Sequence, residues 1–190
     1  MKDLIAKINE CVVCKSFLPH APRPVVQLSS LSKILIISQA PGKRVHESGI
    51  PWNDASGDTL RQWLNVDKET FYDAEKFAFM PMSFCYPGKG KSGDLAPRNE
   101  CAPVWHSEIL KEILKPEVTL LIGQYAHKHY LNSREGLTSD VKGFRRFLPQ
   151  FFPLPHPSPR NFNWMRINPW FSDEVLPYLQ QITEAILKQK

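Results

Sequence analysis

The chain of 190 residues is long enough for one domain that buries roughly 70% of the surface of its unfolded chain, so its four cysteines are not needed as disulfides. Charged residues make up 23% and hydrophobic residues 42%, a globular balance, and the apolar runs are far shorter than the ~20 residues of a membrane helix. The net charge of +5 favours a polyanionic partner without establishing one.

The N-terminal stretch from Met1 to Lys7 predicts an amphipathic helix with interleaved charges, and it lacks the apolar core of a signal peptide. We therefore expect a cytoplasmic protein without a membrane segment. In that compartment paired cysteines more often serve metal or redox chemistry than disulfides.

Four short apolar runs alternate with helical patterns along the chain. The first run, Ile34-Leu35-Ile36-Ile37 within 33–38, is unbroken, as in a central strand that is buried on both faces. The further runs lie at 77–84, 118–122 and 151–154. Amphipathic helices are predicted at 58–64, 102–114 and 124–131, and a closing helix at 172–190 with Ser172 as its N-cap. Strands separated by helices predict an α/β fold in three layers around a four-stranded parallel sheet, and we expect a single domain over 1–190.

Three loops follow the carboxyl ends of these strands, where open α/β sheets place their ligand crevice. They span 39–57, 85–101 and 156–170. Basic residues gather in or beside the last two loops, which favours a nucleic-acid surface, although an ordinary solvated face explains them as well.

The cysteines form two pairs. Cys11 and Cys14 make a Cys-x-x-Cys motif in the N-terminal segment 1–30, and Cys85 and Cys101 bracket a loop of fifteen residues that is rich in Gly and Pro. Four thiolates satisfy either tetrahedral zinc or a four-iron cluster, and their spacing does not separate the two. Four reduced, partly buried thiols are the alternative.

This arrangement resembles the iron-sulfur branch of the uracil-DNA glycosylase superfamily, in which an N-terminal Cys-x-x-Cys joins two later cysteines that flank a Pro-rich loop. The likeness includes the phrases Cys85-Tyr86-Pro87-Gly88 and Pro97-Arg98-Asn99-Glu100-Cys101 and runs over nearly the whole chain. It implies a 4Fe-4S cluster, with zinc as the alternative, a sheet of strand order 2-1-3-4, and an enzyme that acts on single- or double-stranded DNA containing a damaged base. We expect a monomer.

The segment after the first strand resembles the first motif of the superfamily, with Ser38 in place of its first glycine. The residue before Ala40-Pro41-Gly42 is usually an acid that positions water in the iron-sulfur enzymes, but here it is Gln39, which cannot act as a base. Asp54 lies in Asn53-Asp54-Ala55-Ser56-Gly57, which is similar to a Gly-Asp-x-Ser-Gly turn of a related branch. The resemblance therefore implies that Asp54, with Gln39, orients water at an oxocarbenium-like sugar. A helix cap is the alternative role for Asp54.

The resemblance also implies how the base is bound. Trp52 corresponds to the aromatic residue on which the flipped base stacks, with core packing as the alternative. Superfamily members usually read uracil with an asparagine four residues before the third cysteine, where this chain has Pro81, which has no side-chain donor. Another residue takes over, or a different base is preferred, or DNA is bound without excision. The predicted base-binding residues are Gln39, Ala40, Trp52, Asn53 and Ser83.

A second motif of the superfamily, His-Pro-Ser, resembles His156-Pro157-Ser158. Prolines on both sides hold His156 on a rigid loop, where the resemblance implies that it donates to the departing base. The aromatic residues that follow provide candidates for a wedge into the base stack, or they pack against the closing helix. The predicted DNA contacts are Ser158, Arg160, Asn161, Lys89 and Arg98.

Three functions fit these patterns. The first is a DNA repair glycosylase that flips a damaged base, with uracil expected, and hydrolyses its N-glycosidic bond. The second, suggested by Gln39 and Pro81, is a DNA-binding or damage-sensing protein that kept the fold and the cluster but lost catalysis. The third is a zinc-bound nucleic-acid module. For the first, we expect Gln39, Trp52, Asp54 and His156 to line one cleft.

Overall fold

The computed structural model describes residues 1–113 and 115–189. Leu114 and Lys190, which end two of the predicted helices, lie outside the described residues. At the centre is a four-stranded, all-parallel sheet of strand order β2-β1-β5-β6. Its strands are β2 (Phe77–Phe79), β1 (Ile34–Ile37), β5 (Val118–Ile122) and β6 (Phe151–Leu154). The predicted fold class and strand order are confirmed.

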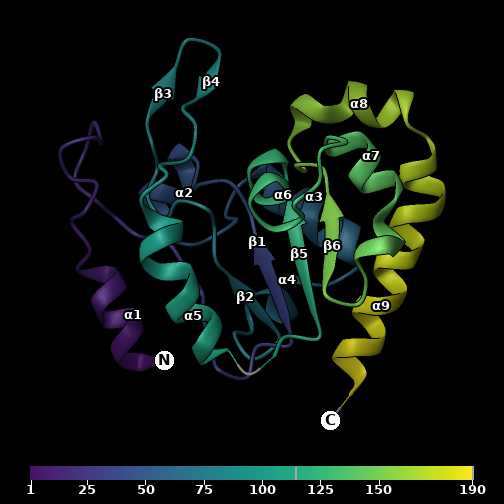
Figure 1. Ribbon diagram of the computed structural model, residues 1–190, viewed down its shortest axis with the longest axis horizontal. Helices are drawn as coiled ribbons and strands as arrows, with labels where there is room; N and C mark the ends of the chain where they lie inside the picture. The colour runs from purple at the N-terminus through teal and green to yellow at the C-terminus, as the bar shows by residue number, and fades with distance from the viewer. Residues whose placement is uncertain (114, 190) are drawn as a thin grey trace.

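Alternate residues of the strands point to opposite faces of the sheet, and each face is covered by helices. Leu35, Ile37 and Leu121 pack in one apolar cluster, whereas Ile36 and Leu120 pack in another on the opposite face. The first cluster includes residues of α1 (Lys2–Asn9), α5 (Ser107–Glu112) and α6 (Gln124–Tyr130). The second includes residues of α3 (Ala55–Leu64), α4 (Lys68–Tyr72), α7 (Leu137–Lys142) and α9 (Leu176–Lys188). The result is the predicted three-layer sandwich (Figure 1).

The second strand is shorter than predicted. The run 77–84 pairs as a strand only from Phe77 to Phe79. Pro81 has no amide hydrogen to continue the pairing on the outer side of β2, where the Phe79 amide donates to the Gln27 carbonyl. The chain nevertheless follows the end of β1, because the amides of Met82 and Ser83 donate to Ser38 and Gln39. This places Pro81 beside the first motif.

Two predicted helices differ in detail. The segment 102–114 opens with a π-helical turn, Ala102–His106, before α5. The prediction that Ser172 is an N-cap is wrong, because Ser172 lies inside a π-helical turn, Phe171–Val175, that runs into α9. Pro177 follows this turn at the second position of α9.

Several short elements lie near the carboxyl edge of the sheet and were not predicted. They are α2 (Lys43–Ser48), α8 (Phe162–Ile167), a hairpin of β3 (Lys89–Gly90) and β4 (Gly93–Asp94), and a 3-10 turn at Pro159–Asn161. A second 3-10 turn, Phe144–Phe147, leads into the start of β6. In Figure 1 the hairpin and α8 rise on either side of this edge, and both chain ends lie at the other end of the molecule. No described helix is long and apolar enough to cross a membrane.

Candidate active site

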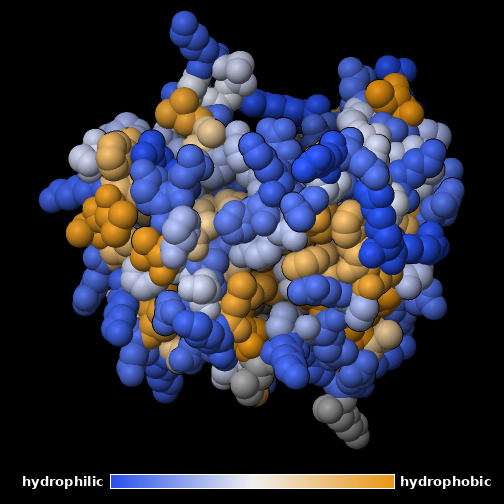
Figure 2. Space-filling view, in the orientation of Figure 1, coloured by the Kyte–Doolittle hydropathy of each residue, from blue (hydrophilic) through white to orange (hydrophobic). Residues whose placement is uncertain are grey.

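A cleft of about 600 Å³ lies at the carboxyl edge of the sheet. The loop after β1, the loop after β6 and the segment around the hairpin all contribute to it. Figure 2 shows the surface hollowed between the hairpin and α8, with a mainly hydrophilic rim. Of the predicted site residues, those that line the cleft are Gln39, Ala40, Trp52, Asp54, His156, Ser158, Arg160 and Asn161.

Asp54 both caps a helix and faces the cleft. It is the N-cap of α3, and its Oδ1 accepts a hydrogen bond of 2.9 Å from the Gly57 amide. Gly57 has to be glycine, because a Cβ there would lie 1.8 Å from the carbonyl oxygen of Trp52. The cap therefore fixes one carboxylate oxygen, while Oδ2 is turned toward the backbone of Gly42 in the cleft.

Trp52 is held in an unusual backbone conformation, with φ of 57°. A bulky residue adopts this region only when its surroundings impose it. Its side chain is 9% exposed and packs with the core, yet it also borders the cleft. Its ring lies 6.0 Å from the His156 ring, centroid to centroid, at 30°. Both roles considered for Trp52 are therefore compatible with its position.

His156 is fixed by the backbone around it. The carbonyl of Leu154, at the end of β6, accepts from the Gly123 amide and from Nε2 of the buried His127, which also donates to Leu121. The Asn161 amide group donates to the His156 carbonyl at 2.7 Å. Desolvation lowers the pKa of His156, while Asp54 acts in the opposite direction. The ring is thus neutral at pH 7 and can serve as a hydrogen-bond donor.

Gln39 lies against Gly123. A Cβ on Gly123 would be 3.5 Å from the Gln39 Nε2, and the φ of +82° at Gly123 also favours glycine. None of the described residues hydrogen-bonds the Gln39 carboxamide, so its donor and acceptor are available to a ligand. Pro81 borders the same cleft, and its carbonyl accepts from Nε2 of the buried His106 at 3.1 Å.

A family model of the uracil DNA glycosylase superfamily matches residues 26–180, most of the chain. The chain belongs to this superfamily. Among solved structures, it is similar to wild-type SMUG2 of Pedobacter heparinus, with 14% sequence identity and a TM-score of 0.40 over 81% of this chain and 74% of that chain. The cleft is therefore the cleft of a superfamily member, while the segment with Cys11 and Cys14 precedes the matched residues.

Four predicted contacts of this superfamily member do not line the cleft, namely Asn53, Ser83, Lys89 and Arg98. Ser83 is fully buried, and its hydroxyl donates to the Cys85 carbonyl at 3.2 Å, so it does not replace the missing asparagine. Lys89 lies exposed on the hairpin, and Asn53 is half-buried beside the cleft. Arg98 pairs with Glu100 and lies 4.5 Å over the Phe17 ring. These contacts hold the Arg98 side chain against Glu100 and Phe17.

Some polar groups of the loop after His156 are engaged in hydrogen bonds within the protein. The Ser158 Oγ accepts from the Arg160 amide at 3.3 Å, which leaves its hydroxyl hydrogen for a phosphate. Of the candidate wedges, Trp164 lines the cleft and donates to Thr138, whereas Phe162 is 61% exposed on α8. Trp170 packs against Trp164 with ring centroids 5.7 Å apart, which supports the packing role for Trp170.

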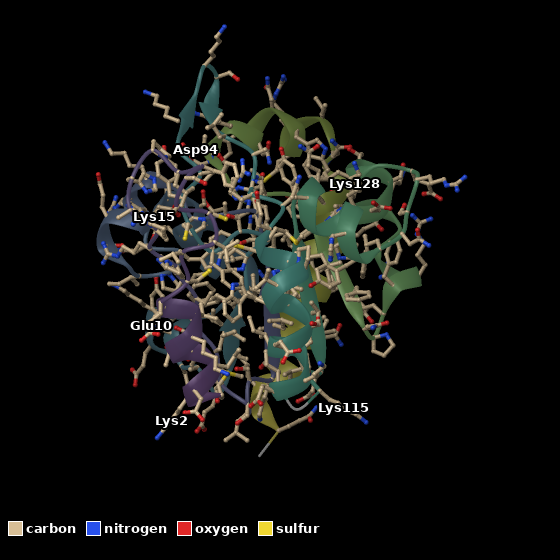
Figure 3. All side chains as sticks on the ribbon, turned by 60° about the vertical axis from the view of Figure 1, so that its left-hand side comes forward. Lys2, Glu10, Lys15, Asp94, Lys115 and Lys128 are labelled. Carbon is tan, nitrogen blue, oxygen red and sulfur yellow. The ribbon has the colours of Figure 1, made fainter. Side chains whose placement is uncertain are left out.

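The four cysteines share one region and carry free thiols. Cys14 and Cys85 pack in one small cluster, and the Phe84 amide donates to the Cys101 Sγ at 3.5 Å. Burial first, and then the neighbouring cysteines, raise the pKa of Cys85 to about 12 and that of Cys101 to about 11. Figure 3 shows several sulfur atoms near the loop that carries Lys15.

The donor set fits a thiolate-bound cofactor in its chemistry, because four cysteines of one neighbourhood supply four ligands. Among the described residues, however, no group of three or more His, Cys, Asp or Glu side chains is arranged to hold a single metal ion. A four-iron cluster binds each thiolate to a different iron and so spaces its ligands more widely than one ion does. The identity of the cofactor therefore stays a prediction.

Sequence reasoning missed Asp94. It ends β4 and lines the cleft, and its Oδ1 accepts from the Tyr86 hydroxyl at 3.1 Å. No local pattern marks it, since it is one acid within a Gly- and Pro-rich loop. Arg160 was predicted, but not its hydrogen bond across the cleft to the Ser92 carbonyl, at 3.2 Å.

Proposed function

We propose that the protein is a DNA glycosylase that flips a damaged base, with uracil as the expected substrate, and hydrolyses its N-glycosidic bond. The observation that carries this proposal is the convergence of Asp54, His156 and Trp52 on one cleft in a member of the uracil DNA glycosylase superfamily. Membership alone supports a glycosylase, and the side chains of this cleft support the reaction.

The chemistry follows from these positions. A base that has left the DNA stack lies against Trp52, a contact worth ~1 to 3 kcal/mol. As the glycosidic bond breaks, positive charge develops on the sugar and negative charge on the base. The free oxygen of Asp54 offsets the first, and the neutral His156 ring donates to the second. The Gln39 carboxamide offers one donor and one acceptor to the base edge, in place of the missing asparagine.

DNA binding is proposed for the rim of the cleft. Ser158 and Arg160 border the cleft, and Lys89 stands exposed on the hairpin above it. Contacts of this kind to phosphates position DNA and carry no sequence information. We propose that one domain, which includes the N-terminal segment because Ile8 packs with sheet residues, acts as a monomer in the cytoplasm.

We also propose that Cys11, Cys14, Cys85 and Cys101 bind a 4Fe-4S cluster, with zinc as the alternative. The free, mutually neighbouring thiols support this assignment. Such a cluster would stabilise the N-terminal loop against the loop between Cys85 and Cys101. Metal analysis with a visible absorption spectrum of purified protein separates iron from zinc, and a metal-free preparation that folds normally contradicts both.

Uracil release from single-stranded and duplex oligonucleotides tests the catalytic proposal. We expect release by the wild type and a loss of about 100-fold or more in Asp54→Asn, because the substitution removes transition-state charge stabilisation. Asparagine also caps helices well, so the fold and the affinity for DNA should be retained. Full activity of Asp54→Asn would contradict the assignment of Asp54.

The second candidate function is a DNA-binding or damage-sensing protein without catalysis. Gln39 and Pro81 favour it, because neither supplies the group that the superfamily usually has at that position. Binding of uracil-containing DNA without any base release, at any enzyme concentration, would select this function over the first.

A further inference from the structure

We infer that Asp94 is a second catalytic carboxylate of the cleft, which the hairpin delivers opposite Asp54 to hold the attacking water between them. The inference rests on the proposed glycosylase function. It assigns a role to a residue outside both resembled motifs.

The position of Asp94 is set by its neighbours. The Tyr86 hydroxyl donates to its Oδ1 at 3.1 Å, which turns the other oxygen, Oδ2, toward the first motif. That oxygen is 3.6 Å from the point where a Cβ on Gly42 would lie. Figure 3 labels Asp94 at the foot of the hairpin, where the hairpin joins the body of the protein.

The same point lies 3.8 Å from the Oδ2 of Asp54. The space that a side chain at Gly42 would fill is therefore bordered by the free oxygens of two carboxylates. Each carboxylate has its other oxygen already engaged, by the Gly57 amide or by the Tyr86 hydroxyl. A water in this space has the polar partners that an ordered water requires, and it can donate its hydrogens to acceptors that are held in place.

Two carboxylates supply what Gln39 cannot. The water oxygen attacks the sugar carbon as the glycosidic bond breaks, and the bonding electron pair leaves with the base, which accepts a hydrogen bond from His156. One water hydrogen passes as a proton to a carboxylate, and the new hydroxyl stays on the sugar. The second carboxylate remains charged and stabilises the cationic sugar.

The hairpin that carries Asp94 is tied to the second motif. Arg160 donates to the Ser92 carbonyl, and its guanidinium passes over Gly93, where a Cβ would lie 2.3 Å from Nη1. Gly93 also has a φ of +146°, which few other residues adopt. The loop of His156 and the carboxylate of Asp94 are thus connected across the cleft, so both walls are held in one arrangement.

The test is single-turnover uracil release by Asp94→Asn. Asparagine can still accept from Tyr86 but carries no charge, so we expect release to slow by about 100-fold with unchanged DNA affinity. Asp173→Asn, an exposed carboxylate on another element, is the matched control and should behave as the wild type. If Asp94→Asn releases uracil at the wild-type rate, the inference about Asp94 is overturned and the proposed function is unaffected. A wild type that releases no base overturns the proposed function, and this inference with it.

Two further variants separate catalysis from a purely structural role. Gly42→Ala fills the shared space with contacts of ordinary van der Waals length and touches neither carboxylate chemically, so it should fold and yet lose release as Asp94→Asn does. Tyr86→Phe removes the anchor and keeps the charge, so it should cost much less. Wild-type release by Gly42→Ala, or equal losses in Tyr86→Phe and Asp94→Asn, would overturn the shared water.

Discussion

The two walls of the cleft are built differently. The wall on the sheet carries Gln39, Asp54 and His156 on loops that leave buried strands, and main-chain hydrogen bonds and buried histidines hold those loops. The wall opposite is a two-stranded hairpin with an exposed lysine, tied to the rest by Tyr86 and Arg160. A hairpin alone is marginally stable in water, so its position depends on these few contacts. The sheet wall is pre-organised, whereas the hairpin wall is positioned by side chains.

The largest expected effect comes from a substitution in the sheet wall. His156→Ala removes the donor to the departing base and should slow uracil release by about 100-fold to 1,000-fold, because the ring is a pre-organised donor at developing charge. DNA affinity should change little, since the proposed role of the ring is to donate to the base and not to a phosphate. Single-turnover release and equilibrium binding measure the two quantities. Parallel losses in both would show that His156 binds DNA and does not act on the base.

The next prediction concerns His106, which supports the sheet wall through its hydrogen bond to the Pro81 carbonyl. Burial lowers the pKa of His106 from its ordinary value near 6.5 to about 4, so the unfolded state binds the proton more readily. Stability is then fully present above pH 6.5 and is lost as the pH falls toward 4, by up to roughly 3 kcal/mol for this residue. His106→Gln can keep the bonds to Tyr130 and Pro81 without titrating.

Denaturant unfolding between pH 7.5 and pH 4 measures this effect. The other buried histidines titrate in both proteins, so the difference between the two pH profiles isolates His106. We expect a flatter profile for His106→Gln. Identical profiles would mean that protonated His106 is accommodated within the fold.

The smallest expected effect concerns the link between the walls. Arg160→Ala should weaken binding to all DNA sequences and lower the slope of log affinity against log salt by about one unit, as for one lost phosphate contact. Binding titrations at several salt concentrations measure it. Lys2→Ala removes a charge at the other end of the molecule from the hairpin, where Figure 3 labels it, and serves as the control. If Arg160→Ala leaves the slope unchanged, Arg160 does not contact a phosphate, and its hydrogen bond to the Ser92 carbonyl is its only remaining role.

Much of the site could be predicted from motifs because the motifs follow strands. The aliphatic runs predict buried strands, and parallel strands bring their carboxyl ends to one edge, so Asp54 and His156 meet although a hundred residues separate them. For Asp54 the motif left a helix cap and a catalytic carboxylate as alternatives, and the structure shows that both are compatible, because the cap uses one oxygen and leaves the other free. Base contact by Ser83 was predicted as well. The direction in which the Ser83 side chain points depends on packing, however, and in the structure this side chain is fully buried.

The amino-acid sequence by itself determined the α/β class, the order of strands through its family motifs, and the residues that reach the carboxyl edge, because hydrophobic periodicity and turn residues act locally. Only the tertiary structure decided that Asp94 stands opposite Asp54 and that Arg160 reaches Ser92. These relations join segments far apart in the chain. They depend on how the loops pack against the folded core, and no local sequence pattern predicts that packing.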